Sequence, residues 1–392
     1  MTSISNEIHL PVTERANNLS TSIDVASSIN MIRILRQCDQ QIFTGYLDYP
    51  CLSDAAIHLK IKSSIQTVVN VLSTTDGKVV MSGSGTSGRL GMLIARDLNA
   101  SLLQSGMVSM DSLPFGYTIS GGDAAILLSD ELPEDDPITA VHDLHNCTLH
   151  NSNVCLIGIT CGLSAPYVAG QVDYILDTIE DQAEETTKDN ETTYSTIMMG
   201  FNPDVLARDT PIELWKHRQQ ENKNNENKQK KSMSVRDVVL RLHAMEKQQQ
   251  LESLESKAVL LNPVVGPESI CASSRMKGGS ITKILLDIVL TIACKQVYGM
   301  KYNQELKFHS SEMSTSASIS AESISVIQSS TPLTVLEEIA TTVSIYDSVS
   351  DSKNNYFYSF ILSFNCLLFV FSYLKFLRNL KLIFLCHLYI PF

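Results

Sequence analysis

The sequence predicts an α/β fold with a doubly wound parallel sheet, and three observations lead to this prediction. Short apolar runs alternate with helical patterns along residues 56–298, the order typical of βαβ units. Residues 153–159 form a nearly continuous apolar run, as expected of a strand that is buried on both faces. Two predicted strands end in loops rich in glycine and hydroxyl side chains, and ligands of such sheets bind at the carboxyl ends of strands.

Residues 1–55 are predicted to form a helical segment that precedes this domain. Its one clear helix is marked by apolar side chains at helical spacing, namely Ile29, Ile32, Ile34, Leu35 and Cys38. Residues 56–75 carry a second helical pattern, which opens the α/β domain.

The α/β domain is predicted over 56–298. Its apolar runs predict strands over 78–82, 116–120, 153–159 and 196–201, with helices over 88–104, from Pro166, over about 234–256 and over 275–298. Pro166 suits the first turn of a helix, and Ser273 and Ser274 are predicted to cap the last one. Gly278 lowers helix propensity at the start of that helix, so we expect close packing or ligand approach there.

Two polar stretches, 180–193 and 219–231, are predicted to be solvated insertions, because their composition cannot support a core. Residues 299–355 are expected to form a linker and a helix. The tail, 356–392, has no Asp, Glu, Gly or Ala but holds eight of the twelve Phe. Three interpretations stay open for it: aberrant sequence that truncates the protein, a membrane anchor at the short end of the necessary length, or a segment packed on the domain.

Composition limits the classes of function. The 392 residues carry a net charge of −12, which argues against a nucleic-acid surface. Nine cysteines without CxxC pairs or a targeting segment favour reduced thiols in the cytoplasm. His142, His145 and Cys147 lie near one another in the sequence, but no second ligand pair follows at zinc spacing. We therefore expect no metal site and no cofactor.

Residues 83–91, with the sequence GSGTSGRLG, connect a predicted strand to a predicted helix. Glycines let the backbone come close to a ligand. Thr86 and Ser87 offer hydroxyls beside the N–H groups of the helix start, where the helix dipole favours an anion. The pattern is typical of a phosphate-binding loop, with an ordinary turn capped by Ser or Thr as the alternative. A second loop with hydroxyls, TCGLSAP, follows the strand at 153–159.

Five motifs occur in order over most of residues 10–300, at 83–89, 119–123, 158–171, 200–203 and 273–280. In these motifs the sequence resembles the glucokinase regulatory protein family. It is also similar to the N-acetylmuramic acid 6-phosphate etherases, though less so at 158–171. The resemblance implies a three-layer αβα sugar-isomerase (SIS) domain with a flavodoxin-like sheet.

The resemblance to the regulatory family implies a protein that binds fructose 6-phosphate or fructose 1-phosphate, performs no chemistry, and modulates a glucokinase or another hexokinase-type enzyme. It implies a cytoplasmic location, with the nucleus as a second one. The ligand-binding positions that it implies are Gly85, Thr86, Ser87, Glu134, Thr160, Cys161, Gly162 and Ser164. Taken alone, Glu134 is more often simply an exposed acid.

Two other functional hypotheses stay open. The resemblance to the etherases implies a carbon–oxygen lyase whose two catalytic acids would be Glu134 and Asp97, although Asp97 is one methylene shorter than the glutamate of that family, and small misplacements are costly. A non-functional truncated fragment is the other alternative. Because the regulatory family continues into a second SIS domain that this sequence replaces with its tail, we also expect pairing of two copies as a homodimer.

Overall fold

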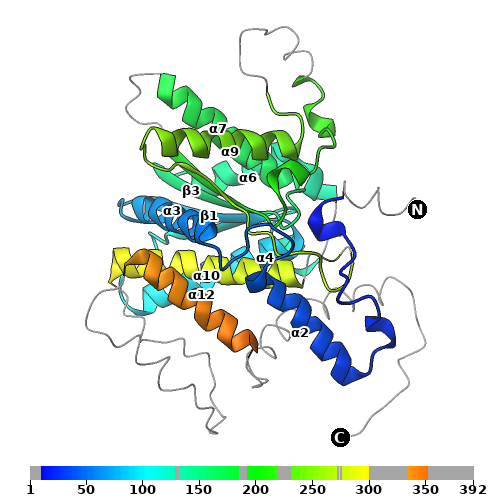
Figure 1. The fold of residues 1–392 in the computed structure, drawn as a ribbon. Coiled ribbons are helices and arrows are strands. Elements are labelled where there is room, and N and C mark those ends of the chain that lie inside the picture. The colour runs from blue at the N-terminus through cyan, green and yellow to red at the C-terminus, as the bar shows by residue number, and fades with distance from the viewer. Residues whose placement is uncertain are drawn as a thin grey trace, which may run out of the picture.

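The computed structural model describes residues 10–128, 132–184, 192–218, 231–271, 273, 276–299 and 334–351. These residues form an αβα sandwich around a parallel sheet of five strands (Figure 1). The strands are β1 (Gly77–Gly83), β2 (Phe115–Ile119), β3 (Asn153–Ile159), β4 (Thr193–Met199) and β5 (Ala258–Leu261). Their order is β2-β1-β3-β4-β5, so the prediction of a doubly wound parallel sheet with flavodoxin-like strand order is confirmed, and the order reverses between β1 and β3.

The strand side chains alternate between two cores, as the two-residue period of a strand requires. On β1, Val79 and Met81 join one core, whereas Val80 joins the other. Both cores are apolar because helices cover both faces of the sheet, and this is why the central strands read as apolar runs in the sequence.

Three helices pack on each face. The first core is closed by α3 (Ala55–Leu72), α4 (Gly85–Gln104) and α10 (Lys277–Tyr298), and the second by α6 (Pro137–Thr148), α7 (Pro166–Glu184) and α9 (Val235–Leu251). Figure 1 shows α6, α7 and α9 on one side of the sheet, with α4 and α10 on the other. Outside the first layer lie α2 (Ser28–Thr44) and α12 (Val335–Asp351), which contribute Ile42, Ile339 and Val343 to its core.

Short helical turns complete the described structure. They are α5 (Ala124–Leu127), η1 (Val12–Glu14), η2 (Ile23–Val25), η3 (Leu132–Asp135), η4 (Asp204–Leu206) and η5 (Glu213–Trp215).

The structure corrects several expectations. The predicted apolar face of α2 is only partly buried, because Ile29 and Ile32 are exposed while Cys38 is buried. The helix predicted over 275–298 begins at Lys277, with Met276 and not Ser273 or Ser274 at its N-cap. In addition, α7 continues to Glu184, into the first predicted insertion, because Ile179 reaches the core and Glu180 pairs with Arg241 of α9.

Other expectations fall on residues that the structure does not describe. The tail 356–392 lies outside the described residues, as do 185–191 and 219–230 of the predicted insertions. Among the helices that the structure describes, none combines the length and the apolar character needed to cross a bilayer.

Candidate functional site

The two loops that the sequence singled out meet at the carboxyl edge of the sheet. The first loop follows β1 and the second follows β3, and these strands are neighbours. The hydroxyl oxygen of Ser87 lies 3.7 Å from the sulfur of Cys161. The loops therefore come together where the strand order reverses, which is the usual position of ligand sites in such sheets.

The first loop is a tight turn into α4, a helix of 20 residues. Gly85 has φ of 52°, a left-handed conformation that glycine adopts readily. A Cβ on Gly83 would lie 2.8 Å from the backbone nitrogen of Gly88, so no larger residue fits there. Thr86 and Ser87 lie in the first turn of α4, where the N–H groups and the helix dipole favour an anion.

Two further serines at this edge of the sheet carry buried hydroxyls. Ser84 is the N-cap of α4 and Ser120 directly follows β2. The hydroxyls of both are buried and have no hydrogen-bond partner among the described residues. A hydroxyl donates as well as accepts, so these two groups suit a phosphate oxygen. Sequence reasoning missed them, although a polar residue just after a buried strand was a usable signal.

The second loop is shaped by its own hydroxyl. The Thr160 oxygen accepts hydrogen bonds from the backbone N–H groups of Ser164, at 3.0 Å, and Ala165, at 3.2 Å. Leu163 takes a left-handed conformation with φ of 51°. Burial raises the pKa of the Cys161 thiol to about 11, so this group stays protonated and is a weak donor rather than a nucleophile.

The first residues of α10 pack against the second loop and form one wall of the site. A Cβ on Gly278 would lie 3.2 Å from the Cys161 sulfur, which confirms the close approach expected there. The Glu268 carboxylate accepts the backbone N–H groups of Lys277 and Gly278, each at 2.8 Å. Because a protein carboxylate already occupies this helix N-terminus, the start of α4 is the better place for a phosphate.

The buried side chain of Lys277 connects this wall, the start of α10, to α2 in the N-terminal segment. The Lys277 ammonium donates to the side-chain oxygen of Gln41 on α2, at 2.7 Å, and to the carbonyls of Val265 and Pro267. Burial lowers the pKa of Lys277, while the nearby Glu268 carboxylate opposes that shift. Burial raises the pKa of Glu268, against the two N–H groups that it accepts. Hydrogen bonds within the protein thus hold both side chains, and with them the start of α10.

The N-terminal segment is fastened to the second loop. The Asn202 side chain accepts the backbone N–H of Thr13, at 3.0 Å, and donates to the Thr13 hydroxyl and to the carbonyl of Gly162. Asn202 is fully buried. The motif at 200–203 therefore carries a side chain that holds two segments together.

Glu134 lies half-buried in η3, a single turn of helix. The turn is fixed on one side by Arg208, whose guanidinium donates to the Asp135 carboxylate, at 2.9 Å, and to the carbonyl of Ser164, at 3.3 Å. Arg89, which follows the first loop, donates to two carbonyls of α5, Ala125 and Ile126. Arg208 thus links the turn that carries Glu134 to the second loop, whereas Arg89 links α4 to α5. Sequence reasoning did not identify either contact.

Asp97 is the predicted site residue that the structure keeps apart from the loops. It is exposed on α4, ten residues after Ser87, which corresponds to about 15 Å along a helix. The histidine group is also explained without a ligand, because His145 packs edge-on against Tyr174 with ring centres 4.9 Å apart. Across the residues that the structure describes, no cluster of three His, Cys, Asp or Glu side chains could hold a metal.

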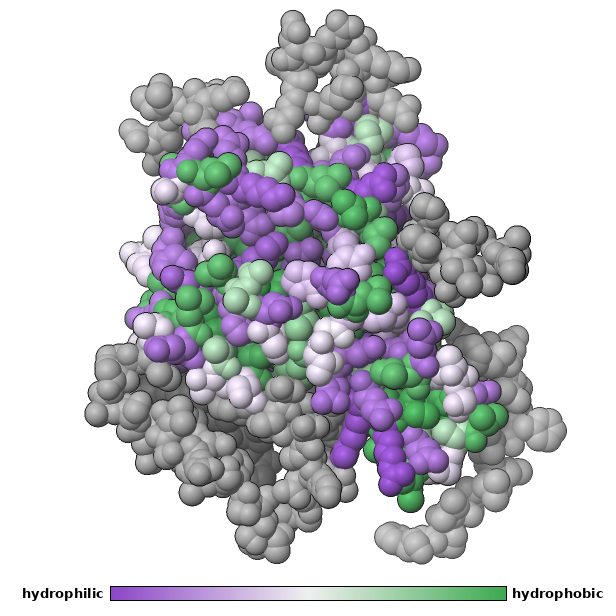
Figure 2. All heavy atoms as spheres, in the orientation of Figure 1, coloured by the Kyte–Doolittle hydropathy of each residue, from purple (hydrophilic) through white to green (hydrophobic). Residues whose placement is uncertain are grey.

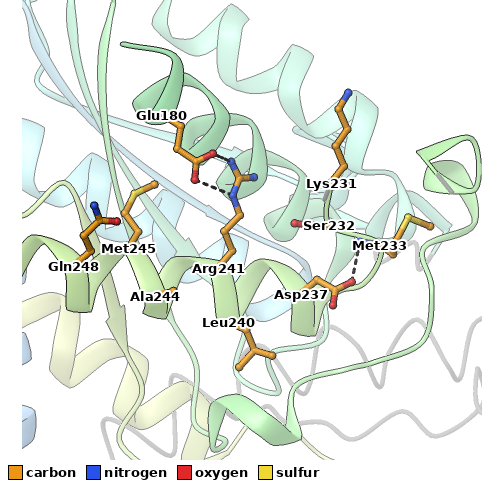
Figure 3. Close-up of a pocket in the computed structure, with 10 residues that line it drawn as sticks. All are labelled: Glu180, Lys231, Ser232, Met233, Asp237, Leu240, Arg241, Ala244, Met245 and Gln248. Atoms are coloured by element: carbon orange, nitrogen blue, oxygen red, sulfur yellow. Dashed lines mark hydrogen bonds and ion pairs between the residues drawn. The ribbon is translucent and has the colours of Figure 1, made fainter. Parts of the chain in front are cut away.

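A separate cleft of about 560 Å³ opens on the other face of the sheet, between α7 and α9 (Figure 3). Figure 3 shows the Arg241 guanidinium in this cleft bonded to the Glu180 carboxylate. Arg241 also pairs with Asp173 and Asp177. None of the loop residues lines the cleft, and its arginine is already paired, so the two loops remain the better candidate.

Comparisons with known proteins agree with this geometry. Residues 60–176 match a family described as the glucokinase regulatory protein N-terminal SIS domain. The chain is 34% identical to the glucokinase regulatory proteins of Homo sapiens, over 296 residues, and Xenopus laevis, over 295 residues; these matches cover 74% of this chain and 41% of each relative. It is 27% identical over 288 residues to the N-acetylmuramic acid 6-phosphate etherase of Pasteurella multocida, covering 73% of this chain and 70% of that relative.

Proposed function

Because the chain carries an SIS domain of the kind found at the N-terminus of glucokinase regulatory proteins, we propose that it is a regulatory protein that binds a phosphorylated hexose. The observation that carries the proposal is the contact between Ser87 and Cys161, which unites the two loops at the start of α4. The unpaired hydroxyls of Ser84 and Ser120 at the same place support a phosphate there.

The phosphate would lie against the N–H groups of Gly85 and Thr86 and the hydroxyls of Thr86 and Ser87, with the helix dipole supplying favourable charge in a chain that is acidic overall. Glu134 would accept hydrogen bonds from sugar hydroxyls. Residues of the second loop, Thr160, Cys161, Gly162 and Ser164, would contact the ligand from the other side. Fructose 6-phosphate and fructose 1-phosphate are the ligands that we propose.

The partner that we propose is a glucokinase or another hexokinase-type enzyme, whose activity would respond to the bound sugar, in the cytoplasm or the nucleus. The chain spans 41% of the length of the regulatory proteins that it matches, and the partner is proposed on that partial match. A second copy of the chain is a further proposed partner.

A lyase function has less support. The similarity to the etherase covers more of that relative, but two catalytic carboxylates must both reach the substrate. Asp97 is exposed on α4, well separated along the helix from Ser87. Within one chain, Asp97 therefore does not share a site with the first loop.

Replacing Ser87 with tyrosine tests the proposed binding. A tyrosine ring in the first turn of α4 would fill the space of the phosphate, so we expect no measurable binding of fructose 6-phosphate by isothermal titration calorimetry. Ser101→Tyr is the matched control, because Ser101 is exposed near the other end of α4. Equal affinities of the wild type and Ser87→Tyr would refute the proposed site, and a wild type that binds no hexose phosphate would refute the function.

A further inference from the structure

Given the phosphosugar-binding function proposed above, we infer that Arg208 is a positioning residue for the sugar end of the site. It connects the turn that carries Glu134 to the second loop. By holding these two segments at a fixed separation, Arg208 sets the place of the Glu134 carboxylate, while the first loop alone sets the place of the phosphate.

The geometry at Arg208 joins three pieces of chain. One guanidinium nitrogen donates both to the Asp135 carboxylate, at 2.9 Å, and to the carbonyl of Ser164, at 3.3 Å. The backbone N–H of Arg208 donates to the carbonyl of Leu163, at 3.0 Å. A single residue thus binds the second loop through its main chain and its side chain, and reaches across to the neighbour of Glu134.

Both segments need such support. η3 has only four residues, from Leu132 to Asp135, and a short 3₁₀ turn depends on tertiary contacts because it makes few hydrogen bonds of its own. Leu163 holds a left-handed conformation, which persists only where surrounding contacts fix it. Because Glu134 is adjacent to Asp135, movement of the turn displaces its carboxylate directly.

The described structure also contains a second ion pair, similar in exposure to that of Arg208 and Asp135, which contacts neither loop. Arg236 pairs with Asp209, and the side-chain exposed fractions of that pair, 35% and 56%, are close to the 36% and 63% of Arg208 and Asp135. Exposed pairs contribute little to global stability. Removing either arginine should therefore leave the protein folded, and only the loss of Arg208 should affect the ligand.

The test compares two ligands by calorimetry in the full chain. Arg208→Ala should raise the dissociation constant of fructose 6-phosphate roughly tenfold, because the preorganised sugar contact is lost. The dissociation constant of inorganic phosphate should change by less than about twofold, because the first loop is intact. Arg208→Lys should give an intermediate loss, since the ammonium keeps the positive charge but not the fixed planar geometry of the guanidinium. Arg236→Ala should bind both ligands like the wild type.

Amide hydrogen exchange gives a readout that does not need a ligand. Exchange over residues 132–136 and 160–165 should accelerate in Arg208→Ala and not in Arg236→Ala, because loss of the link allows local opening. Unchanged exchange in Arg208→Ala would overturn the positioning role.

The binding results separate the remaining outcomes. Unchanged affinity of Arg208→Ala for fructose 6-phosphate, in a protein where Ser87→Tyr abolishes binding, overturns this inference and leaves the proposed function intact. An equal loss for both ligands would make Arg208 a direct phosphate contact and also overturn it. If the wild type binds neither ligand, the proposed function and this inference fail together.

Discussion

Glu246 on α9 is a buried carboxylate with only one of its oxygens paired. The residue is 2% exposed, and one oxygen lies 3.5 Å from the ammonium of Lys60. The other oxygen has no hydrogen-bond partner among the described residues. Burial raises the pKa of Glu246, and the charges of Lys60 and His243 counter only part of that shift.

This raised pKa predicts a pH-dependent effect of Glu246→Gln. A raised pKa favours the protonated acid in the folded state, so the stability that it contributes is present below the ordinary pKa and is lost as the pH rises through the raised one. Glutamine stays neutral at every pH. We therefore expect the free energy of unfolding of Glu246→Gln, relative to the wild type, to increase between about pH 4 and about pH 8 in urea titrations.

The matched control for that titration is Glu252→Gln, at the exposed end of the same helix. The substitution removes an exposed carboxylate from the same helix, so its effect at the two pH values is the reference for Glu246→Gln. A constant difference between Glu246→Gln and the wild type would show that the Glu246 carboxyl titrates alike in the folded and unfolded chains.

At the scale of single residues, the motifs predicted which positions are important, but they did not predict the hydrogen-bond partners of each side chain. Thr160 was predicted as a ligand contact, and its oxygen accepts two N–H groups of its own loop. Arg89 lies in the first motif, and its guanidinium holds carbonyls of α5. The spacing of residues in the sequence indicates which kind of loop is present. It does not distinguish the residues that stabilise the loop from those that contact a ligand.

Among the elements, the N-terminal segment has a structural role that its sequence did not reveal. η1 carries Thr13, which bonds to Asn202 through both its backbone and its hydroxyl. Farther along, Asn17 donates to the side chain of Gln41 and to the carbonyl of Pro267. The segment thus fastens the second loop to α2 and to the residues that precede α10.

Asn202→Ala tests this fastening. The substitution leaves the backbone N–H of Thr13 and the carbonyl of Gly162 without their partner, and an unsatisfied buried group costs about 1–3 kcal/mol. We expect the free energy of unfolding, measured in urea, to fall by about that amount. Asn30→Ala, which removes only an exposed bond to Arg33, should change it by less than about 0.5 kcal/mol. Equal effects of the two substitutions would contradict the proposed fastening.

The sequence analysis missed several features of the helices and strands, and these differ in how clearly the sequence indicates them. α6 begins with Pro137 after Asp136, whose carboxylate accepts the N–H groups of Ile138 and Thr139, a cap that the sequence does display. β5 has only four residues, too few for periodicity to distinguish strand from helix. The start of α10 is capped by Glu268 from outside the helix, a contact that only the folded chain creates.

For the whole molecule, α12 covers part of the outer surface of the first helical layer, where it packs on α3, α2 and α10. The side chains of Ile339 and Val343, both on α12, are buried in the first core. Lys295 of α10 pairs with Glu338 of α12, at 2.6 Å. Among the exposed apolar side chains of the described residues are three on η2 and α2, Val25, Ile29 and Ile32, which are 80%, 65% and 50% exposed and which we call the apolar strip.

This strip makes the proposed self-association testable. Figure 2 shows hydrophobic residues among polar ones where Figure 1 places α2, and exposed apolar patches favour association. A twofold pair is the commonest closed assembly, so we expect a dimer when the full chain is sedimented at micromolar concentration. Ile29→Glu should shift the protein to a monomer, because a charge would be buried in the interface.

Leu251→Glu is the control for that shift. Leu251 is 87% exposed and ends α9, which belongs to the opposite helical layer from the strip on α2. A dimer that tolerates Leu251→Glu and dissociates in Ile29→Glu would assign self-association to the strip. A wild type that sediments as a monomer would contradict the proposed pairing, and equal dissociation by both variants would place the contact elsewhere. If the wild type is a monomer, the sugar site has to be complete within one chain, and affinity for fructose 6-phosphate would then be independent of protein concentration.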